Sequence, residues 1–332
     1  MYIDLKENGY EAVIERGCFE KAENLLNLKR KVLIVTDEGV PSKYSKALAN
    51  KCDFATILTV PQGEKSKSFV FLEKLCSVML EKGFHRKDCV VAVGGGVCGD
   101  LAGFAASVFM RGIDFYNIPT TLLSQIDSSV GGKTAVNLGT VKNIVGSFYQ
   151  PKKVLIDPTL LETLDKRQLS NGYAEAIKMG LTSDEKLFNM FYENKIDIIE
   201  VITRSLDVKR KIVEQDEKES NLRKVLNFGH TLGHGIEANC DGELYHGECV
   251  GIGMRYMCSD SVREKLDVAL KNVNLPITSD VEKDLILKAA MHDKKASSGS
   301  VDIIYVENPG SFEIRKISEK ELKEVLYNEK VK

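Results

Sequence analysis

Three of the five histidines in the sequence, His230, His234 and His246, lie close together and form its clearest chemical signal. His230 and His234 are four residues apart, so a helix would place both imidazoles on one face. Clustered imidazoles suit a divalent metal such as zinc, and a catalytic zinc often takes a carboxylate as well. The other interpretation is two core or capping histidines and one surface histidine. The carboxylates that could complete a metal site are Glu175, Glu237, Glu243 and Glu248.

The HExxH pattern of metalloproteases is missing here because Thr231 stands where the glutamate would be. A second chemical pair, Glu175 and Lys178, lies three residues apart in GYAEAIKMG, on one face of a predicted helix. Such pairs are commonly exposed and contribute little free energy. The small and apolar neighbours of this pair instead indicate that both side chains are buried.

A glycine-rich loop, Gly94–Asp100 (GGGVCGD), follows a predicted strand and opens a predicted helix. Glycines let the backbone approach a diphosphate, and a helix N-terminus supplies N–H groups to it. The GxGxxG pattern is present, but two predicted strands precede it, and the acid sought downstream, Asp114, comes before a strand. The alternative is a tight turn that needs a positive φ. Asp37 and Pro61–Lys67 close two earlier strands and could face the same ligand, or could be ordinary polar loops.

The central stretch Arg111–Gln150 is rich in Thr, Ser, Gly, Asn and Lys. Thr120-Thr121 follows a predicted strand, Lys133 follows two glycines, and Lys142-Asn143 adds a second cation beside an amide. Such groups suit a phosphate together with hydroxyls. The alternative is a surface loop of solvated lysines, and the segment lacks the spacing of a Walker A loop.

The elements that must position these groups divide the chain into two halves. Short, continuously apolar runs alternate with a helical pattern at Ser68–Lys82, which predicts a parallel sheet covered on both faces. Beyond Pro158 the pattern is helical, with a long apolar stripe over Ile196–Glu217. We therefore expect an α/β domain at 1–157 and a mainly helical domain at 158–332. The predicted strands are Lys31–Asp37, Phe54–Val60, Asp88–Val93, Phe115–Ile118 and Lys153–Ile156, with a later hairpin at Val301–Val306 and Phe312–Lys316.

Composition restricts the classes of partner. The 46 basic and 48 acidic residues give a formal net charge of -2, so no overall field attracts nucleic acid or an anionic membrane. No apolar run is long enough to span a bilayer, and the N-terminus does not resemble a signal peptide. The eight cysteines form no CxxC pair and lie mostly in apolar runs, which indicates a reducing compartment. We expect a cytoplasmic protein with a small-molecule ligand.

Taken together, these motifs resemble the 3-dehydroquinate synthase family of sugar phosphate cyclases, over roughly Lys31–Lys295. The resemblance is carried by GGGVCGD, RGIDFYNIPTTLLSQIDSSVGGKTAVN, KNIVGSFYQP, GYAEAIKMG and LNFGHTLGHGIEA with YHGE. It implies an α/β nucleotide-binding domain followed by an all-α domain. Cys98 and Val141 depart from the family pattern, and the first departure should not matter. The retained Ser128–Lys133 run favours the dehydroquinate branch over related cyclases.

The resemblance also implies residue roles. The metal, zinc or cobalt, would be held by Glu175, His230 and His246, with His234 close to the reacting groups. Arg111 would reach the site of a neighbouring subunit, which implies a homodimer. Substrate contacts would come from Lys133, Asn143, Lys178, Lys209, Arg223, Asn227, His234 and one of Lys294 and Lys295. NAD contacts would come from Asp37, Glu64, Lys67, Gly95, Gly96, Asp100, Thr120, Thr121, Asp127, Lys133, Lys142, Leu161, Glu162, Thr163 and Leu164.

The activity implied is that of an NAD- and metal-dependent carbon–oxygen lyase. It would convert 3-deoxy-arabino-heptulosonate 7-phosphate to 3-dehydroquinate and phosphate, with transient oxidation by NAD. Lys133, Asn143 and the neighbour's Arg111 would hold the phosphate, while His234 and Lys178 would handle protons and charge. The alternatives are a metal-dependent NAD polyol dehydrogenase of related fold, another sugar phosphate cyclase, and a protein that binds nucleotide or metal without turnover.

Overall fold

The computed structural model describes residues 1–139, 141–218, 222–293 and 300–328. Its internal contacts divide the chain into two compact units, Met1–Leu164 and Asp165–Lys332. The division falls a few residues beyond the boundary expected after residue 157, because the 3-10 helix η6 (Pro158–Thr163) belongs to the first unit.

The first unit is built on a seven-stranded sheet with the order β1-β2-β9-β6-β5-β3-β4. All neighbouring pairs are parallel except the edge pair of β1 and β2, which is antiparallel. A separate antiparallel hairpin, β7 with β8, packs against α4. The strands are β1 (Tyr2–Ile3), β2 (Tyr10–Ile14), β3 (Lys31–Asp37), β4 (Phe54–Val60), β5 (Cys89–Gly94), β6 (Asp114–Pro119), β7 (Lys133–Leu138), β8 (Val141–Phe148) and β9 (Lys153–Ile156).

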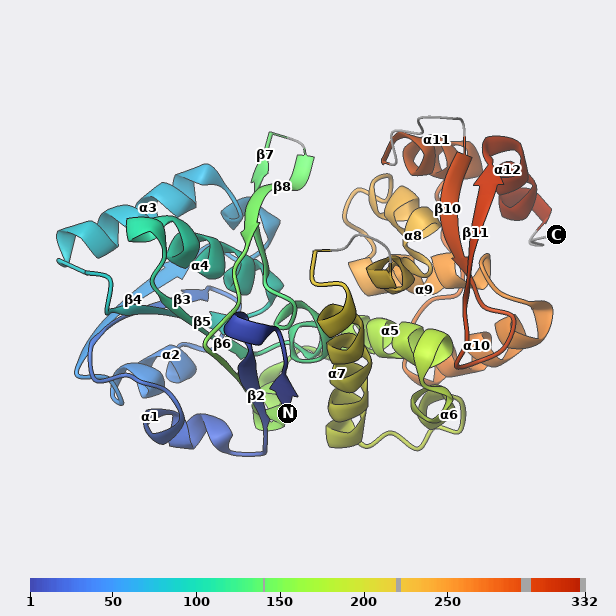
Figure 1. Ribbon diagram of the computed structural model, residues 1–332. Coiled ribbons are helices and arrows are strands. Elements are labelled where there is room, and N and C mark those ends of the chain that lie inside the picture. The colour runs from blue at the N-terminus through green and yellow to red at the C-terminus, as the bar shows by residue number, and fades with distance from the viewer. Residues whose placement is uncertain (140, 219–221, 294–299, 329–332) are drawn as a thin grey trace. The chain divides into compact units, whose positions relative to one another are not determined.

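Two hydrophobic cores lie on the two faces of this sheet. Successive side chains of a strand point to opposite faces, so Leu33 and Val35 enter one core while Val32 and Ile34 enter the other. In Figure 1, α3 and α4 lie on one side of the sheet and α1 and α2 on the other. The helices are α1 (Ala22–Leu25), α2 (Ser42–Ala49), α3 (Phe69–Glu81) and α4 (Gly96–Val108), with short helical turns η1 (Lys6–Asn8), η2 (Cys18–Lys21), η3 (Glu64–Ser66), η4 (Phe109–Arg111) and η5 (Ser124–Ser128).

The predicted parallel sheet is confirmed, and β3, β4 and β9 have the predicted bounds. Two features were not predicted. The strands β1 and β2 extend the sheet beyond β9, so four strands, rather than two, precede β5, the strand that leads into the glycine loop. The central stretch also contains the β7–β8 hairpin, where polar and exposed residues hide the alternation of a strand.

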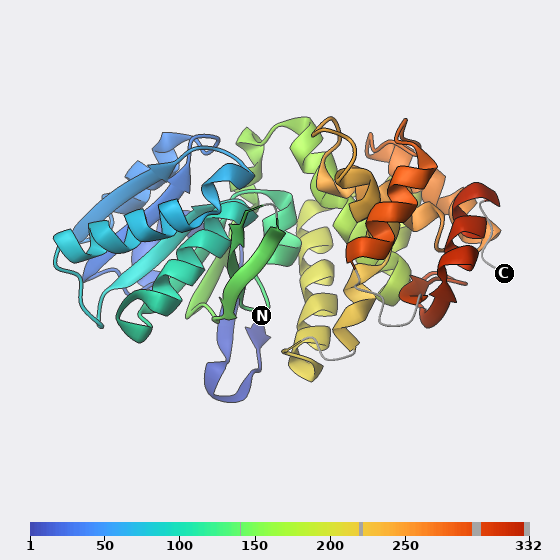
Figure 2. The ribbon, with the colours of Figure 1, turned by 90° about the horizontal axis from the view of Figure 1, so that it is seen from above.

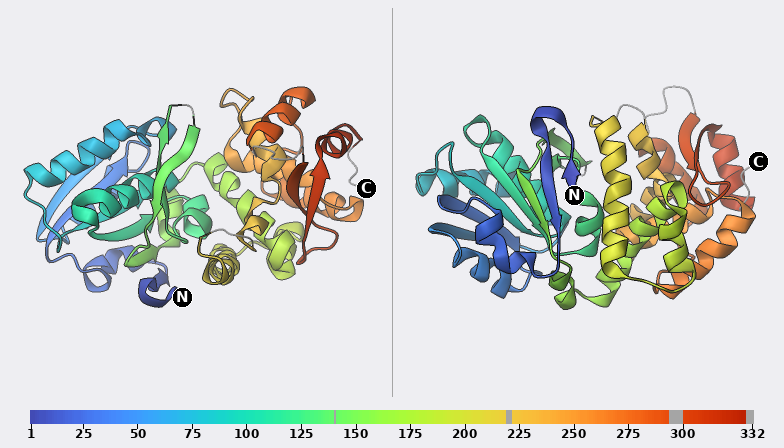
Figure 3. Two further views of the ribbon diagram at one scale, coloured as in Figure 1. Left: turned by 45° about the horizontal axis from the view of Figure 1, so that its top comes forward. Right: turned by 60° about the horizontal axis from the view of Figure 1, so that its bottom comes forward.

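The second unit is mainly helical, as predicted. The two predicted C-terminal strands form the antiparallel hairpin of β10 and β11, which packs next to α12 (Figure 3). Helices α5 and α7 pack against each other (Figure 2), and α8 packs against α9. The elements are α5 (Lys166–Ser183), α6 (Glu185–Tyr192), α7 (Ile198–Gln215), η7 (Leu222–Asn227), α8 (His230–Glu237), α9 (His246–Arg255), α10 (Asp260–Asn272), α11 (Lys283–Asp293), β10 (Ser300–Tyr305), β11 (Glu313–Ser318) and α12 (Glu319–Asn328).

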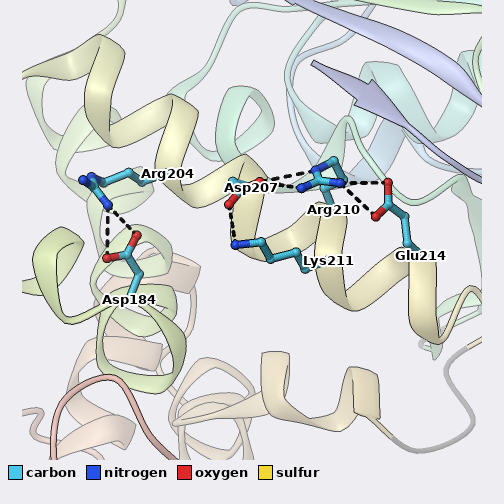
Figure 4. A network of polar contacts seen from close by, with 6 residues as sticks. All are labelled: Asp184, Arg204, Asp207, Arg210, Lys211 and Glu214. Carbon is cyan, nitrogen blue, oxygen red and sulfur yellow. Dashed lines mark hydrogen bonds and ion pairs between the residues drawn. The ribbon is translucent and has the colours of Figure 1, made fainter.

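Helix α7 shows how the apolar stripe orients a candidate site residue. Its apolar residues from Val201 to Val213 are buried, and Lys209 is buried with them at 4% exposure. The other face carries a ladder of ion pairs (Figure 4). That ladder joins Arg204 to Asp184, Arg210 to Asp207 and Glu214, and Lys211 to Asp207, with N–O distances of 3.0, 2.8, 2.9 and 2.7 Å. Among the residues described, no helix combines the length and apolar character needed to cross a membrane.

Candidate active site

In the first unit, several of the predicted NAD contacts meet where β3 and β5 end. The chain leaves β3 toward β4 and leaves β5 in the opposite direction toward β6, so these neighbouring strands form a switch point of the sheet. Asp37 is the last residue of β3, and Gly94 is the last of β5. The Cys98 thiol, on the first turn of α4, donates to Asp37 Oδ2 over 3.1 Å. Asp37 and the glycine loop are therefore adjacent, at the edge where open α/β sheets bind ligands.

The loop glycines are needed for space and not for backbone conformation. Neither Gly94, Gly95 nor Gly96 has a positive φ, which removes the alternative of a left-handed turn. A Cβ on Gly95 would lie 3.1 Å from Thr121, and one on Gly96 would lie 3.1 Å from the Ser128 hydroxyl. The loop thus packs closely against the Thr121–Ser128 segment. Gly95 is the N-cap of α4, whose first backbone N–H groups find no partner within the helix and point to its start.

A second group of predicted NAD contacts is joined by polar interactions. Lys67 Nζ lies 2.5 Å from Asp100 Oδ2 and 3.9 Å from Glu64 Oε1. Asn137 of β7 donates its amide to Glu64 over 2.8 Å, and its backbone N–H donates to the Lys67 carbonyl. Asp100 lies on α4, so this network connects the loop after β4 with the helix that the glycine loop opens.

The remaining predicted contacts of the first unit are placed by shorter links. Thr120 donates its backbone N–H to the Gly94 carbonyl over 3.0 Å, which holds Thr120 and Thr121 beside the glycine loop. Asp127 lies in a short π-helical turn, Ser124–Ser128, a kind of irregularity that is frequent at functional sites. Residues Leu161, Glu162, Thr163 and Leu164 end the unit, and the Thr163 hydroxyl lies 3.1 Å from the Tyr44 hydroxyl.

Lys133 and Lys142 lie on the β7–β8 hairpin and are exposed. The two glycines before Lys133 have φ values of 104° and 66°, and Gly131 receives a fixed position because its N–H donates to the Tyr10 hydroxyl over 3.2 Å. Asn143 has a φ of 56°, and its N–H donates to the Asn137 side chain over 2.8 Å. The exposed lysines therefore lie on a hairpin with defined backbone turns, and their binding role stays a prediction.

Arg111 follows α4 and is exposed. Both Met110 and Arg111 have left-handed backbone conformations, with φ values of 49° and 68°. Non-glycine residues adopt this region at a cost, and such strain concentrates at functional sites. Arg111 thus lies exposed in an unusual backbone turn.

In the second unit, Glu175, His230 and His246 converge. Glu175 Oε1 lies 3.5 Å from His230 Nε2 and 3.3 Å from His246 Nε2. One ligand atom from each of the three residues lies within 4.8 Å of the others, so the group could hold a metal ion. Both Glu175 oxygens are buried and accept no regular hydrogen bond from the described residues, although Lys178 forms an ion pair with Oε2. A buried carboxylate facing two ring nitrogens fits a divalent cation.

Both histidines present Nε2 to Glu175 because Nδ1 is occupied elsewhere. His230 Nδ1 donates to the Phe228 carbonyl over 3.0 Å, and His246 Nδ1 donates to Glu237 Oε2 over 2.8 Å. A hydrogen bond from one ring nitrogen fixes the tautomer and leaves the other nitrogen as the metal ligand.

The ring of His234 completes the cluster and lies on α8, the helix that also carries His230. Its centroid lies 5.2 Å from that of His230 and 5.8 Å from that of His246. His234 is exposed, and it belongs to a second group of possible ligands with Glu237 and His246. The spacing of His230 and His234 suggested these two as the ligand pair, whereas the ring that faces Glu175 together with His230 is that of His246.

The charges in the cluster shift the titration of its members. Burial opposes ionisation of Glu175, but Lys178 and the two histidines hold its pKa well below the usual value. Burial and the charge of Lys178 lower the pKa of His230 to about 3, so this ring is neutral. Burial also disfavours the charged form of His246, yet the carboxylates of Glu175 and Glu237, one beside each ring nitrogen, raise its pKa to about 9.

Helix α5 fixes the start of α9, where His246 lies. Three residues of α5, spaced four apart and thus on one face, contact three consecutive residues at that start. The Asn171 side chain accepts the Gly247 N–H over 2.6 Å, and Arg167 Nε donates to Glu248 Oε1 over 2.7 Å. The contacts pair Arg167 with Glu248, Asn171 with Gly247, and Glu175 with His246. The sequence did not lead to a prediction for Arg167 or Asn171, although their spacing from Glu175 was a usable signal.

Helices α8 and α9 approach closely because glycines line their contact. A Cβ on Gly253 would lie 2.1 Å from the Gly229 carbonyl oxygen, and one on Gly233 would lie 3.0 Å from the Cα of Val250. Gly229 itself has a φ of 76° at the start of α8. The glycines around the histidine motif therefore let two helix backbones meet, which brings His230 and His246 to the same carboxylate.

The four candidate carboxylates have different environments. Glu175 faces the metal-ligand nitrogens, and Glu237 lies behind His246. Glu248 is buried and accepts from Arg167 and from the Tyr245 N–H over 2.7 Å. Glu243 is exposed. Tertiary contacts thus distinguish carboxylates that the sequence left equivalent.

Among the predicted substrate contacts of the second unit, Lys178 contacts the metal group directly through Glu175. Lys178 is buried at 2% exposure, pairs with Glu175 and donates to the Leu226 carbonyl over 2.7 Å, as the predicted buried pair requires. Arg223 is buried, with its N–H on Asp216 and its guanidinium on the Glu217 carbonyl. Asn227 ends η7, three residues before His230. Lys294 and Lys295 lie outside the described residues.

The fold and the cluster define a class of protein. It has a mainly parallel sheet with helices on both faces and a switch point of the kind that binds ligands, followed by a helical unit with a buried Glu-His-His group. The sequence matches the family descriptions "3-dehydroquinate synthase N-terminal" over residues 57–171 and "3-dehydroquinate synthase C-terminal" over residues 172–296. The chain belongs to the 3-dehydroquinate synthase family. The predicted family is confirmed, and so is its enzyme class, a lyase-type cyclase.

Individual relatives support the assignment to this family. A 3-dehydroquinate synthase of Thermoanaerobacter pseudethanolicus is 40% identical over 350 aligned residues, covering 98% of each chain. The solved structure of ValA, a 2-epi-5-epi-valiolone synthase from Streptomyces hygroscopicus subsp. jinggangensis with NAD+ and Zn2+ bound, is 27% identical, with a TM-score of 0.87 over 98% of both chains. A 2-deoxy-scyllo-inosose synthase with carbaglucose-6-phosphate, NAD+ and Co2+ is 24% identical, with a TM-score of 0.86 over 99% of both chains, which shows a shared fold.

Proposed function

We propose that the chain converts 3-deoxy-arabino-heptulosonate 7-phosphate to 3-dehydroquinate and phosphate, using NAD and a divalent metal held by Glu175, His230 and His246. The observation that carries the metal assignment is the convergence of these three side chains, with both Glu175 oxygens buried. The 40% identity to curated 3-dehydroquinate synthases supports the reaction. Zinc and cobalt are the candidate ions, since the solved relatives contain Zn2+ or Co2+.

Residue roles follow from the local chemistry. When bound, the metal supplies a Lewis acid for substrate hydroxyls and NAD supplies a hydride acceptor. In the first unit, the switch-point residues bind NAD, with Asp37 and the glycine loop at its centre, and Lys133 and Asn143 bind the substrate phosphate.

In the second unit, Lys178 balances the charge of Glu175 from a buried position. His234 is exposed beside the two ligand rings, where it can accept or donate a proton at a substrate oxygen. The cations Lys209 and Arg223 and the amide of Asn227 bind the remaining substrate oxygens.

The reaction is tested by incubating the protein with the heptulosonate phosphate, NAD and Zn2+. We expect release of inorganic phosphate and a cyclic dehydroquinate product, with no accumulation of NADH. A polyol dehydrogenase of related fold would instead reduce NAD with a simple alcohol and release no phosphate. Turnover of another sugar phosphate in place of the heptulosonate would assign the chain to a different cyclase activity.

Lys133→Ala is expected to lower kcat/KM about 10- to 100-fold, since one charge-assisted hydrogen bond to phosphate is lost. The amount of bound zinc should stay unchanged, because Lys133 lies in the first unit and the metal ligands in the second. Lys152→Ala removes an equally exposed lysine of the first unit and serves as the control. Wild-type kcat/KM in the Lys133 variant would contradict the phosphate assignment.

We further propose a cytoplasmic homodimer in which Arg111 acts at the neighbouring subunit's site. The strained, exposed Arg111 turn supports this role. Arg111→Ala and Glu175→Gln should each inactivate the enzyme when expressed alone. Co-expression should restore activity, because a mixed dimer then contains one site with both an intact metal group and an intact Arg111. Failure of restoration in a verified mixed dimer would place Arg111 at its own subunit's site.

A further inference from the structure

The ring of His246 lies between two carboxylates, and only one of them belongs to the metal group. Its Nε2 faces Glu175 at 3.3 Å, and its Nδ1 donates to Glu237 Oε2 at 2.8 Å. Glu237 ends α8, the same helix that begins with His230 and carries His234. These three residues have spacings of four and three, so one helix face presents all of them to the start of α9.

We propose that Glu237 is the positioning residue of the metal site, which fixes the tautomer and the orientation of the His246 ring without binding the metal itself. This inference rests on the metal site of the proposed function. His230 is oriented by the Phe228 carbonyl, a backbone group that no substitution removes. His246 lies at the first turn of a helix and is more exposed, with 30% of its side chain accessible against 12% for His230. The orientation of the His246 ring therefore depends on a side chain, that of Glu237.

The surroundings of Glu237 make an alternative use less suitable. Glu237 could join His234 and His246 around a second cation, since their ligand atoms also lie within 4.8 Å. That arrangement would use His246 Nδ1 as a ligand and would remove the proton that now bridges Nδ1 and Glu237. His246 would then bind two cations, one on each nitrogen of the same ring. The carboxylate–histidine–metal order requires no such rearrangement, because the ring already presents Nε2 to Glu175.

The expected effect is on metal affinity. Carboxylates that accept from a ligand histidine orient the ring and raise its basicity, and their removal typically weakens metal binding 10- to 100-fold. Glu237→Ala removes both the charge and the hydrogen bond, and we expect a loss of about that size. Glu237→Gln keeps a hydrogen-bond acceptor without the charge, so we expect a weakening smaller than that of the alanine variant.

The test measures the dissociation constants of Zn2+ and Co2+ by competition with a chelator, in the full chain purified without metal. The absorption spectrum of bound Co2+ provides a second readout, because it reports the ligand geometry. Glu243→Gln is the matched control, since it removes an exposed carboxylate from the loop between α8 and α9 and should leave both dissociation constants within twofold. Thermal unfolding of the metal-free variants checks that each one is folded.

A Glu237→Ala protein that is folded and binds zinc within twofold of wild type, with an unchanged Co2+ spectrum, would overturn the inference. If that variant does not fold, the nearly isosteric Glu237→Gln replaces it, and wild-type affinity in that variant overturns the inference equally. A loss of a second equivalent of Zn2+ with the first equivalent unaffected would also overturn it, in favour of the second cation site. Lack of metal binding by the wild type would instead refute the metal site of the proposed function.

Discussion

Glu175→Gln is expected to abolish metal binding and to lower turnover roughly 10³-fold, since the Lewis-acid contribution of a metal is several kcal/mol. The same change should destabilise the second unit, because it leaves the Lys178 ammonium buried without its counterion. Breaking one side of a buried ion pair costs about 3 to 5 kcal/mol. Bound metal is measured by elemental analysis, activity by phosphate release, and stability by urea unfolding of the metal-free protein.

A second substitution separates the two effects of Glu175→Gln. Adding Lys178→Met replaces the stranded cation with an apolar side chain of similar length, which should recover most of the lost stability. Metal binding should remain absent, since the carboxylate ligand is still missing. A Glu175→Gln protein that retains zinc and turns over at the wild-type rate would refute the metal assignment.

Gly253→Ala should destabilise the second unit by about 3 kcal/mol and weaken metal binding at the same time. The added Cβ would lie 2.1 Å from the Gly229 carbonyl oxygen and 2.8 Å from the Gly233 nitrogen, and both are backbone atoms that cannot rotate away. Helices α8 and α9 must then separate, which moves His230 away from His246. Urea unfolding and zinc titration measure the two consequences.

The control for this prediction comes from the same helix. At Gly251 an added Cβ would meet only the Leu270 side chain, at 3.2 Å, and that side chain can shift. Replacing a helical glycine by alanine also gains up to about 1 kcal/mol of helix propensity. Gly251→Ala should therefore be close to neutral in stability and in zinc affinity. Equal losses in the two variants would mean that backbone contact between α8 and α9 is not what holds the histidines together.

The fold was predictable where burial on both faces of the sheet leaves a continuous apolar run. The strands β3, β4 and β9 match such runs, and β3 is buried along nearly its whole length. The strands β7 and β8 escaped prediction because β8 is exposed and their hairpin is specified by turn residues and by contacts with α4. The short edge strand β1 has only two residues and leaves no periodic signal.

The site was predictable to a different degree. Helical spacing placed His230 and His234 on one face, and both lie on α8. Spacing could not choose among the candidate carboxylates, because Glu175 reaches the histidines from α5, over fifty residues earlier in the chain. The position of the His246 ring between Glu175 and Glu237 depends on helix packing, which no local sequence pattern encodes.

Strand β2 has a consequence for how the chain acquires its structure during synthesis. Within the described part of the chain, β2 pairs in parallel with β9 alone, and the Asp157 carboxylate just after β9 accepts the N–H groups of Gly17 and Phe19, both over 3.0 Å. Residues near the start of the chain must therefore wait until about the first half has left the ribosome, on the order of ten seconds at bacterial or eukaryotic elongation rates. The sheet of the first unit therefore cannot form strand by strand from the N-terminus. Until β9 emerges, the backbone groups of β2 that will pair with it must be kept from pairing with other chains.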